Sequence, residues 1–167
     1  MTVSRFIRVA WLIVKKDLTI EARSLELFLT TLFFAASCVL VFAFGFVSDQ
    51  NPIGDAAAGI LWIAIAFAGT LALGRAFERE RYHDVLHALL LAPVDRPAIY
   101  IGKLLGVICL LAIVEIIIVP LISLFFQTPI LRHPWLLGGL LACGTLGFAS
   151  VGTLFAAMLV RARSRDV

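Results

Sequence analysis

The chain has 167 residues, of which 62% are hydrophobic and 15% are charged, and its mean hydropathy is +1.04. Soluble globular domains contain about 45–50% apolar and about 25% charged residues, so this composition excludes an ordinary water-soluble core. The net charge of +3 does not indicate a nucleic-acid-binding protein, because the basic residues lie between apolar runs and form no clustered basic face. We expect a single membrane domain over residues 1–167, with the lipid bilayer as a partner and no nucleic acid.

The first predicted element, residues 4–24, is an amphipathic helix lying in the interface between membrane and cytoplasm. Its apolar stripe comprises Ile7, Trp11, Val14 and Leu18. Polar side chains fall largely elsewhere, namely Arg8, Lys15, Lys16 and Thr19. Because the two lysines interrupt the apolar stretch and no small-residue cleavage site follows, we interpret the segment as retained and not as a signal peptide.

Four apolar runs then predict an all-α integral membrane protein with about four transmembrane helices. A spanning helix needs about 17–25 residues, and free backbone groups have no water to bind inside a bilayer, so each run should be helical. The predicted spans are residues 27–48, 56–74, 99–126 and 135–160.

The distribution of basic residues predicts the orientation. Thirteen of the 14 Lys and Arg residues precede the first span, lie between the second and third, or follow the fourth, and only Arg132 lies on the other side. Basic loops stay in the cytoplasm, so we expect both termini, including the tail 161–167, to be cytoplasmic.

Residues 75–93 predict a charged cytoplasmic helix between the second and third spans, ended by Pro93. One face carries Tyr82, Val85, Leu86, Leu89 and Leu90, and the other carries Glu80, His83, Asp84 and His87. The two histidines lie one turn apart, a spacing compatible with a metal or haem iron. Because they lie among acidic residues on an exposed face, we favour a solvated docking surface.

Glu115 is the one acidic residue inside a predicted span, at the centre of residues 104–126. An ionised carboxylate at the centre of a spanning helix costs about 2.5–3.5 kcal/mol on insertion scales, so it should face the bundle interior or a partner, or be protonated. The alternatives are a functional group, a neutral acid hydrogen-bonded between helices, or a shifted span that places Glu115 nearer the outer surface.

Small residues recur every four positions in two spans, at Ala64, Ala68, Ala72 and Ala76 and at Gly139, Cys143 and Gly147. This spacing allows close helix approach, and the alternative is that alanine and glycine are simply common in membrane helices. Signals for enzyme chemistry are weak: the stretch around Ser150 lacks the first glycine of a GxSxG elbow, the cysteines form no CxxC pair, and no nucleotide-binding GxxxxGK[ST] loop is present. We expect no catalytic, metal-binding or cofactor-binding residues.

The order of these elements resembles the membrane subunit of an ABC-2-type transporter, above all in the stretch ERERYHDVLHALLLAPVDRPAIYIGKLLGV. Within that superfamily the chain is similar to the CcmB-type permease, the haem exporter B subunit of cytochrome c maturation. The similarity lies in KKDLTIEARS, RAFERERYHDVLHALLLAPVDR, VPLISLFF and VRARSRDV. Such permeases usually have six spans, so the chain is expected to be two spans short of the family pattern.

The resemblance implies a membrane subunit in the cytoplasmic membrane of a bacterium, with haem as a possible transported or handled ligand. Its implied partners are a cytoplasmic ABC ATPase, other haem-handling membrane subunits and a haem chaperone. The residues it implies for ATPase coupling are Glu78, Glu80, Asp84 and His87.

Two rival functions stay open: an ABC-2 permease for a lipid, polysaccharide or drug, and a non-transporting scaffold of an assembly complex. A membrane enzyme ranks below both, because the sequence lacks paired catalytic groups.

Overall fold

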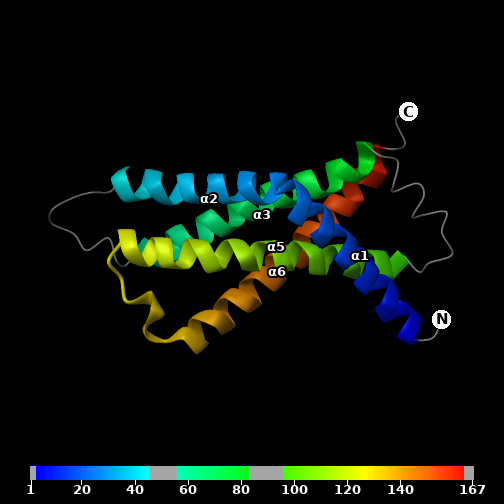
Figure 1. Cartoon of the computed structure of the whole chain (residues 1–167). Coiled ribbons are helices and arrows are strands. Elements are labelled where there is room, and N and C mark those ends of the chain that lie inside the picture. Colours follow the sequence, from blue (N-terminus) through cyan, green and yellow to red (C-terminus); the bar gives the residue numbers. More distant parts are fainter. Residues whose placement is uncertain (1–2, 46–55, 83–95, 164–167) are drawn as a thin grey trace.

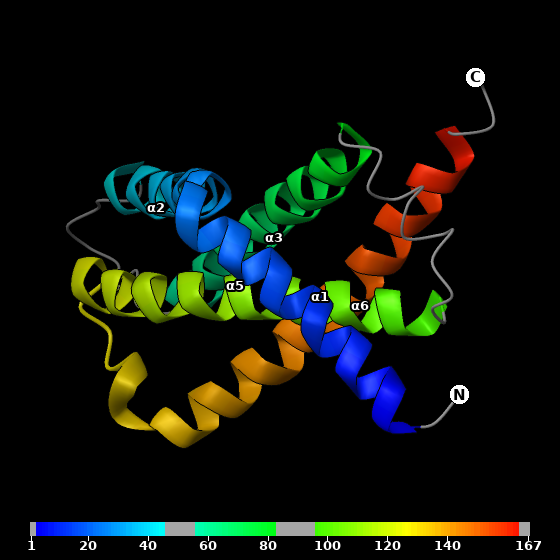
Figure 2. The same cartoon turned by 45° about the vertical axis from the view of Figure 1, so that its right-hand side comes forward.

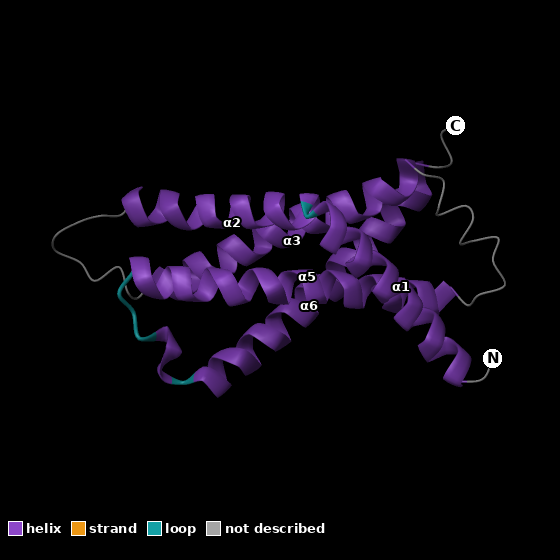
Figure 3. Ribbon diagram, in the orientation of Figure 1, coloured by secondary structure: helices purple, strands orange, loops and turns teal. Residues whose placement is uncertain are grey.

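A computed structural model describes residues 3–45, 56–82 and 96–163 of the chain, and this part is helical without strands (Figure 3). The elements are α1 (Val3–Ser24), α2 (Glu26–Gly45), α3 (Ala57–Tyr82), α5 (Arg96–Phe125), the short 3₁₀ helix η2 (Ile130–Arg132) and α6 (Pro134–Arg163). The predicted all-α class is confirmed.

Four of these helices are long and apolar enough to cross a membrane, as predicted. The qualifying stretches are Glu26–Gly45, Ala57–Arg75, Pro97–Phe125 and Pro134–Met158. The helix that contains the second stretch is longer than predicted, because α3 continues through Arg75 to Tyr82 without a break. Residues 75–82 therefore extend the spanning helix and do not begin a separate one. The rest of the predicted cytoplasmic helix, residues 83–93, lies outside the described residues.

The four spans form a bundle, and α1 crosses it obliquely at one end (Figures 1 and 2). Helix α3 packs against α2, α5 and α6, while α5 also carries almost all of the contacts of α1. The start of α1, the end of α3, the start of α5 and the end of α6 lie at the same end of the bundle (Figure 1). The end of α2, the start of α3 and η2 lie at the other end (Figure 1).

The predicted small-residue packing is confirmed at three positions of α3 and wrong in α6, while the side chain of Ala76 lies outside the described residues. Ala64, Ala68 and Ala72 are fully buried, and their small side chains bring neighbouring helices close to α3. In α6, a Cβ atom added at Gly139 or Gly147 would have no neighbouring atom within 4 Å, and Cys143 is exposed. The inward face of α6 instead carries Thr145, Ala149 and Thr153, all at most 3% exposed.

Much of the outer surface of the spans is apolar. Large side chains exposed by more than half include Phe33, Val41 and Phe44 on α2, Ile116 and Leu124 on α5, and Leu146 and Phe155 on α6. Large apolar side chains exposed in this number on spanning helices are typical of lipid contact.

Helices α1 and α2 meet at a sharp joint formed by Leu25 alone. Leu25 has a φ of 52°, in the left-handed region that a bulky residue rarely adopts. Its amide donates to the Glu21 carbonyl at 2.7 Å, and its own carbonyl accepts from the Leu29 amide at 2.9 Å. The Glu21 carboxylate accepts a further bond from the Phe28 amide at 2.6 Å, which caps the first turn of α2. The chain thus changes direction within one residue.

Candidate functional site

The crossing of α1 over α5 is built around Gly102. A Cβ atom at this position would lie 2.8 Å from Cβ of Ile13 and 3.1 Å from the carbonyl oxygen of Ala10, closer than packed side chains allow. Glycine therefore lets the two helices approach to backbone contact. Ala10, Ile13 and Val14 form the buried seam of α1, each at most 7% exposed.

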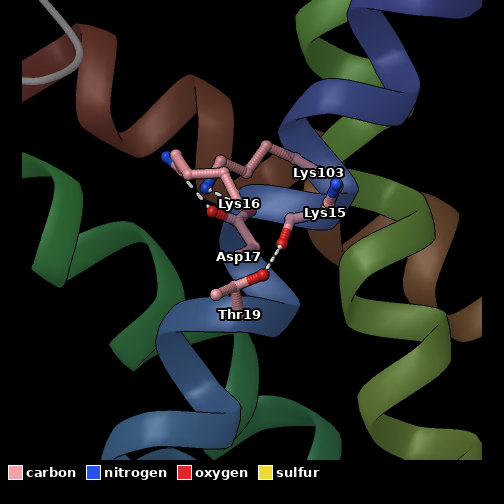
Figure 4. A network of polar contacts seen from close by, with 5 residues as sticks. All are labelled: Lys15, Lys16, Asp17, Thr19 and Lys103. Atoms are coloured by element: carbon pink, nitrogen blue, oxygen red, sulfur yellow. Dashed lines mark hydrogen bonds and ion pairs between the residues drawn. The ribbon is translucent and has the colours of Figure 1, made fainter.

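An ion pair lies next to this crossing. Nζ of Lys103, a residue only 6% exposed, donates to Oδ2 of Asp17 at 2.8 Å. Lys16 approaches the other oxygen of Asp17 at 3.1 Å, and Figure 4 shows both lysines converging on this carboxylate. A buried ammonium group is costly unless it is paired, so Asp17 fixes α1 on α5 in both position and register.

Glu115 lies at the contact between α5 and α6. It is 8% exposed and accepts a hydrogen bond from the hydroxyl of Thr145, which is 3% exposed. The carboxyl group thus faces the bundle interior, one of the placements expected from its sequence position. The apolar stretch Pro97–Phe125 is centred on Leu111, so Glu115 lies about one helical turn beyond the centre, towards the η2 end.

A second polar contact joins the same two helices nearer the α1 end. The Tyr100 hydroxyl donates to the carbonyl oxygen of Ser150 at 2.9 Å. The Ser150 hydroxyl donates to the Gly147 carbonyl within its own helix, at 2.9 Å. Tyr100 and Glu115 are therefore two separate hydrogen-bond ties between α5 and α6.

The four residues expected to couple to an ATPase are not brought together within the described part of the chain. Glu78 and Glu80 lie in α3 beyond its apolar stretch, at the end of the bundle where α1 lies. Asp84 and His87 lie outside the described residues, as does His83. At the same end, Arg75 of α3 approaches Glu26 of α2 at 3.7 Å, an exposed pair that contributes little stability.

Among the described residues, no group of three His, Cys, Asp or Glu side chains is arranged to hold a metal ion. Inside the described bundle, Lys103 pairs with Asp17 and Glu115 pairs with Thr145, each between two helices, whereas the buried hydroxyls of Thr31 and Thr153 have no hydrogen-bond partner. The two pairs position helices relative to one another.

Comparison with protein families gives a match over residues 8–167, to the family described as CcmB protein. The chain belongs to the CcmB family. Comparison with curated proteins and with solved structures gives no match. The resemblance drawn from the sequence is thereby confirmed over nearly the whole chain. Membership implies a multi-pass membrane subunit of a haem-exporting ABC transporter in c-type cytochrome biogenesis.

The fold brings together one stretch that carries the CcmB likeness and the stretch that carries the broader ABC-2 resemblance. Asp17 belongs to KKDLTIEARS, and Gly102 and Lys103 belong to ERERYHDVLHALLLAPVDRPAIYIGKLLGV. Neither the pairing of Asp17 with Lys103 nor that of Glu115 with Thr145 is predicted by the sequence. The available signals are two acids in a basic helix and two threonines in an apolar run, and these signals do not identify which residues pair.

Proposed function

We propose that this CcmB-family chain is the permease subunit of an ABC transporter that supports haem delivery for c-type cytochrome biogenesis, and that a separate cytoplasmic subunit hydrolyses the ATP. The family match over residues 8–167 supports the transporter assignment. In this proposal the chain acts with other haem-handling membrane subunits and a haem chaperone, and haem is the ligand handled by the complex.

The observation that carries the ATPase proposal is the extension of α3. The apolar stretch of α3 ends at Arg75, but the helix continues to Tyr82 and includes Glu78 and Glu80 beyond it. A continuous helix that extends beyond the membrane domain and carries acidic residues can bind a soluble partner and transmit its movement to the membrane domain. Because α3 packs against α2, α5 and α6, movement of its end would reach the whole bundle.

The proposed orientation places the α1 end of the bundle in the cytoplasm of a bacterium, with the protein in the inner membrane. The basic residues support it, since 13 of 14 belong to this end by sequence and only Arg132 to the other. This orientation puts the α3 extension on the side where ATP is available.

Cysteine labelling tests the orientation. In a background without Cys38, Cys109 and Cys143, a membrane-impermeant reagent should label single cysteines introduced at Asn51 or His133 in sealed cells. It should miss cysteines introduced at His83 or Arg163 until the membrane is opened. Labelling at His83 in sealed cells would contradict both the orientation and the ATPase proposal.

Charge reversal tests the coupling. When the double variant Glu80→Lys/Asp84→Lys is purified from native membranes, the amount of co-purified ATPase should fall at least about fivefold. The reason is that the charges of the variant repel the surface of the ATPase that the native acidic residues attract. The loss should grow smaller in high salt, where all electrostatic contributions are screened. Arg132→Glu, a charge reversal at the other end of the bundle, should leave the amount of bound ATPase unchanged.

Identification of the chains that co-purify with the unaltered protein tests the wider assignment. Recovery of an ABC ATPase with haem-handling membrane subunits supports the proposal. Recovery of an ATPase together with enzymes of lipid or polysaccharide export would instead assign another substrate. Unchanged ATPase binding and unchanged cytochrome c yield in the charge-reversal variant would remove the coupling role of residues 78–87.

A further inference from the structure

The charges of α1 are sorted between its two sides. Both acidic residues of α1 have partners within the protein. Asp17 forms ion pairs with Lys103 and Lys16, and Glu21 accepts a hydrogen bond from the Phe28 amide. Basic residues on the outward side, by contrast, are exposed, namely Arg5, Arg8, Lys15 and Arg23. The outward surface of α1 is therefore positively charged and carries no acidic side chain.

Large apolar side chains lie beside these basic residues. Ile7 is 60% exposed, Trp11 is 63% exposed and Leu12 is 54% exposed. The predicted apolar stripe of α1 is thus split: Val14 packs into the bundle, whereas Ile7 and Trp11 do not. Trp11 is three residues from Arg8 and four from Lys15, so the indole and both cations are neighbours on the helix surface.

The position of α1 brings this surface to the edge of the membrane. Its other side is fixed to α5 by the Gly102 crossing and the Lys103 to Asp17 pair, so the outward surface cannot turn towards the bundle. The helix joins α2 directly at Leu25, and α2 begins its apolar stretch at Glu26. Tryptophan is typical of the headgroup level, and adjacent Lys and Arg side chains attract acidic lipids.

From this arrangement we propose that α1 is a binding surface for acidic phospholipid headgroups, with Arg5, Arg8 and Lys15 contacting the phosphates and Ile7, Trp11 and Leu12 inserted beside the acyl chains. The proposal concerns the lipid that surrounds the chain and holds whichever substrate the transporter carries. Each basic residue near an acidic membrane surface contributes about 1 kcal/mol, which corresponds to a preference of about fivefold per residue.

Brominated lipids give a direct test. A variant with Trp62→Phe and Trp135→Phe leaves Trp11 as the sole tryptophan. It is reconstituted in phosphatidylcholine bilayers that contain equal small fractions of brominated phosphatidylglycerol or brominated phosphatidylcholine. Trp11 fluorescence should be quenched at least twofold more by the acidic lipid, and raising the salt should reduce the difference. Equal quenching by both lipids would overturn the proposal.

Charge removal supplies the second measurement. In the same assay, the variant Arg5→Gln/Arg8→Gln/Lys15→Gln should lose most of the additional Trp11 quenching that the acidic lipid causes. The matched control Arg75→Gln/Arg161→Gln/Arg163→Gln removes three charges at the same end of the bundle. This control should keep the additional quenching by the acidic lipid. An equal loss in both variants would show a general charge effect and overturn the specific site. Unselective quenching, combined with loss of bound ATPase in the α1 variant, would assign the surface to a protein partner instead.

Discussion

Glu115→Leu should remove most of the c-type cytochrome maturation that the unaltered chain supports, whereas Glu115→Gln should keep most of it. Glutamine retains the shape and can still accept the hydrogen bond from Thr145, but leucine cannot. The leucine variant leaves the buried Thr145 hydroxyl without that acceptor, at a cost of about 1–3 kcal/mol. The tie that holds α6 against α5 at this depth would be lost.

Complementation of a strain that lacks the protein measures this effect, with cytochrome c yield normalised to the amount of inserted chain. The control is Ile116→Leu, a change at the neighbouring position, where the side chain is 72% exposed and should be insensitive. Adding Thr145→Val to Glu115→Leu should restore part of the activity, because both partners are then apolar. Failure of the glutamine variant at normal protein levels would show that Glu115 must ionise. Normal maturation with the leucine variant would show that neither the hydrogen bond of Glu115 nor its ionisation is needed.

Gly102→Ala should destabilise the protein, and Gly106→Ala should stabilise it. The two glycines lie one turn apart on α5 and both face α1. A methyl group at Gly102 would meet Cβ of Ile13 at 2.8 Å and force α1 away, at a cost of about 1–3 kcal/mol for an overpacked contact. At Gly106 its nearest neighbour would be Oδ2 of Asp17 at 3.7 Å, an ordinary contact. There the higher helix propensity of alanine should add up to about 1 kcal/mol.

Thermal unfolding of the two purified variants in one detergent tests this difference in sign. Gly102→Ala should lower Tm and also lower cytochrome c yield, since α1 would lose its register on α5. Gly106→Ala should raise Tm or leave it unchanged, with normal yield. Shifts of equal sign and size in both variants would contradict the close crossing at Gly102.

Much of this fold was predictable because apolar run length alone identifies spanning helices. The all-α class and the four spans follow from runs too long and too uncharged for any other structure, and the buried alanines of α3 follow from their spacing. The continuation of α3 past Arg75 was not predicted. Its charged residues marked the end of the apolar run, but charge does not end a helix once it has left the membrane.

The pairing of helices was less accessible to sequence reasoning. In a membrane both the lipid-facing and the protein-facing sides of a helix are apolar, so periodicity does not distinguish them. For this reason the spacing of Gly139, Cys143 and Gly147 predicts a packed face, whereas the structure exposes these residues. The inward position of Glu115 is predicted by the cost of a carboxylate in hydrocarbon. That cost does not identify Thr145 as its partner.

The joint at Leu25 also decides how deep α1 can lie. A chain that turns sharply normally leaves amide groups unbonded, and it must then turn in water, because bare amides are not tolerated in hydrocarbon. Here the amides of Leu25, Phe28 and Leu29 all have acceptors across the turn. These three hydrogen bonds lower the cost of placing the bend in the headgroup layer, where the chain turns without a polar linker.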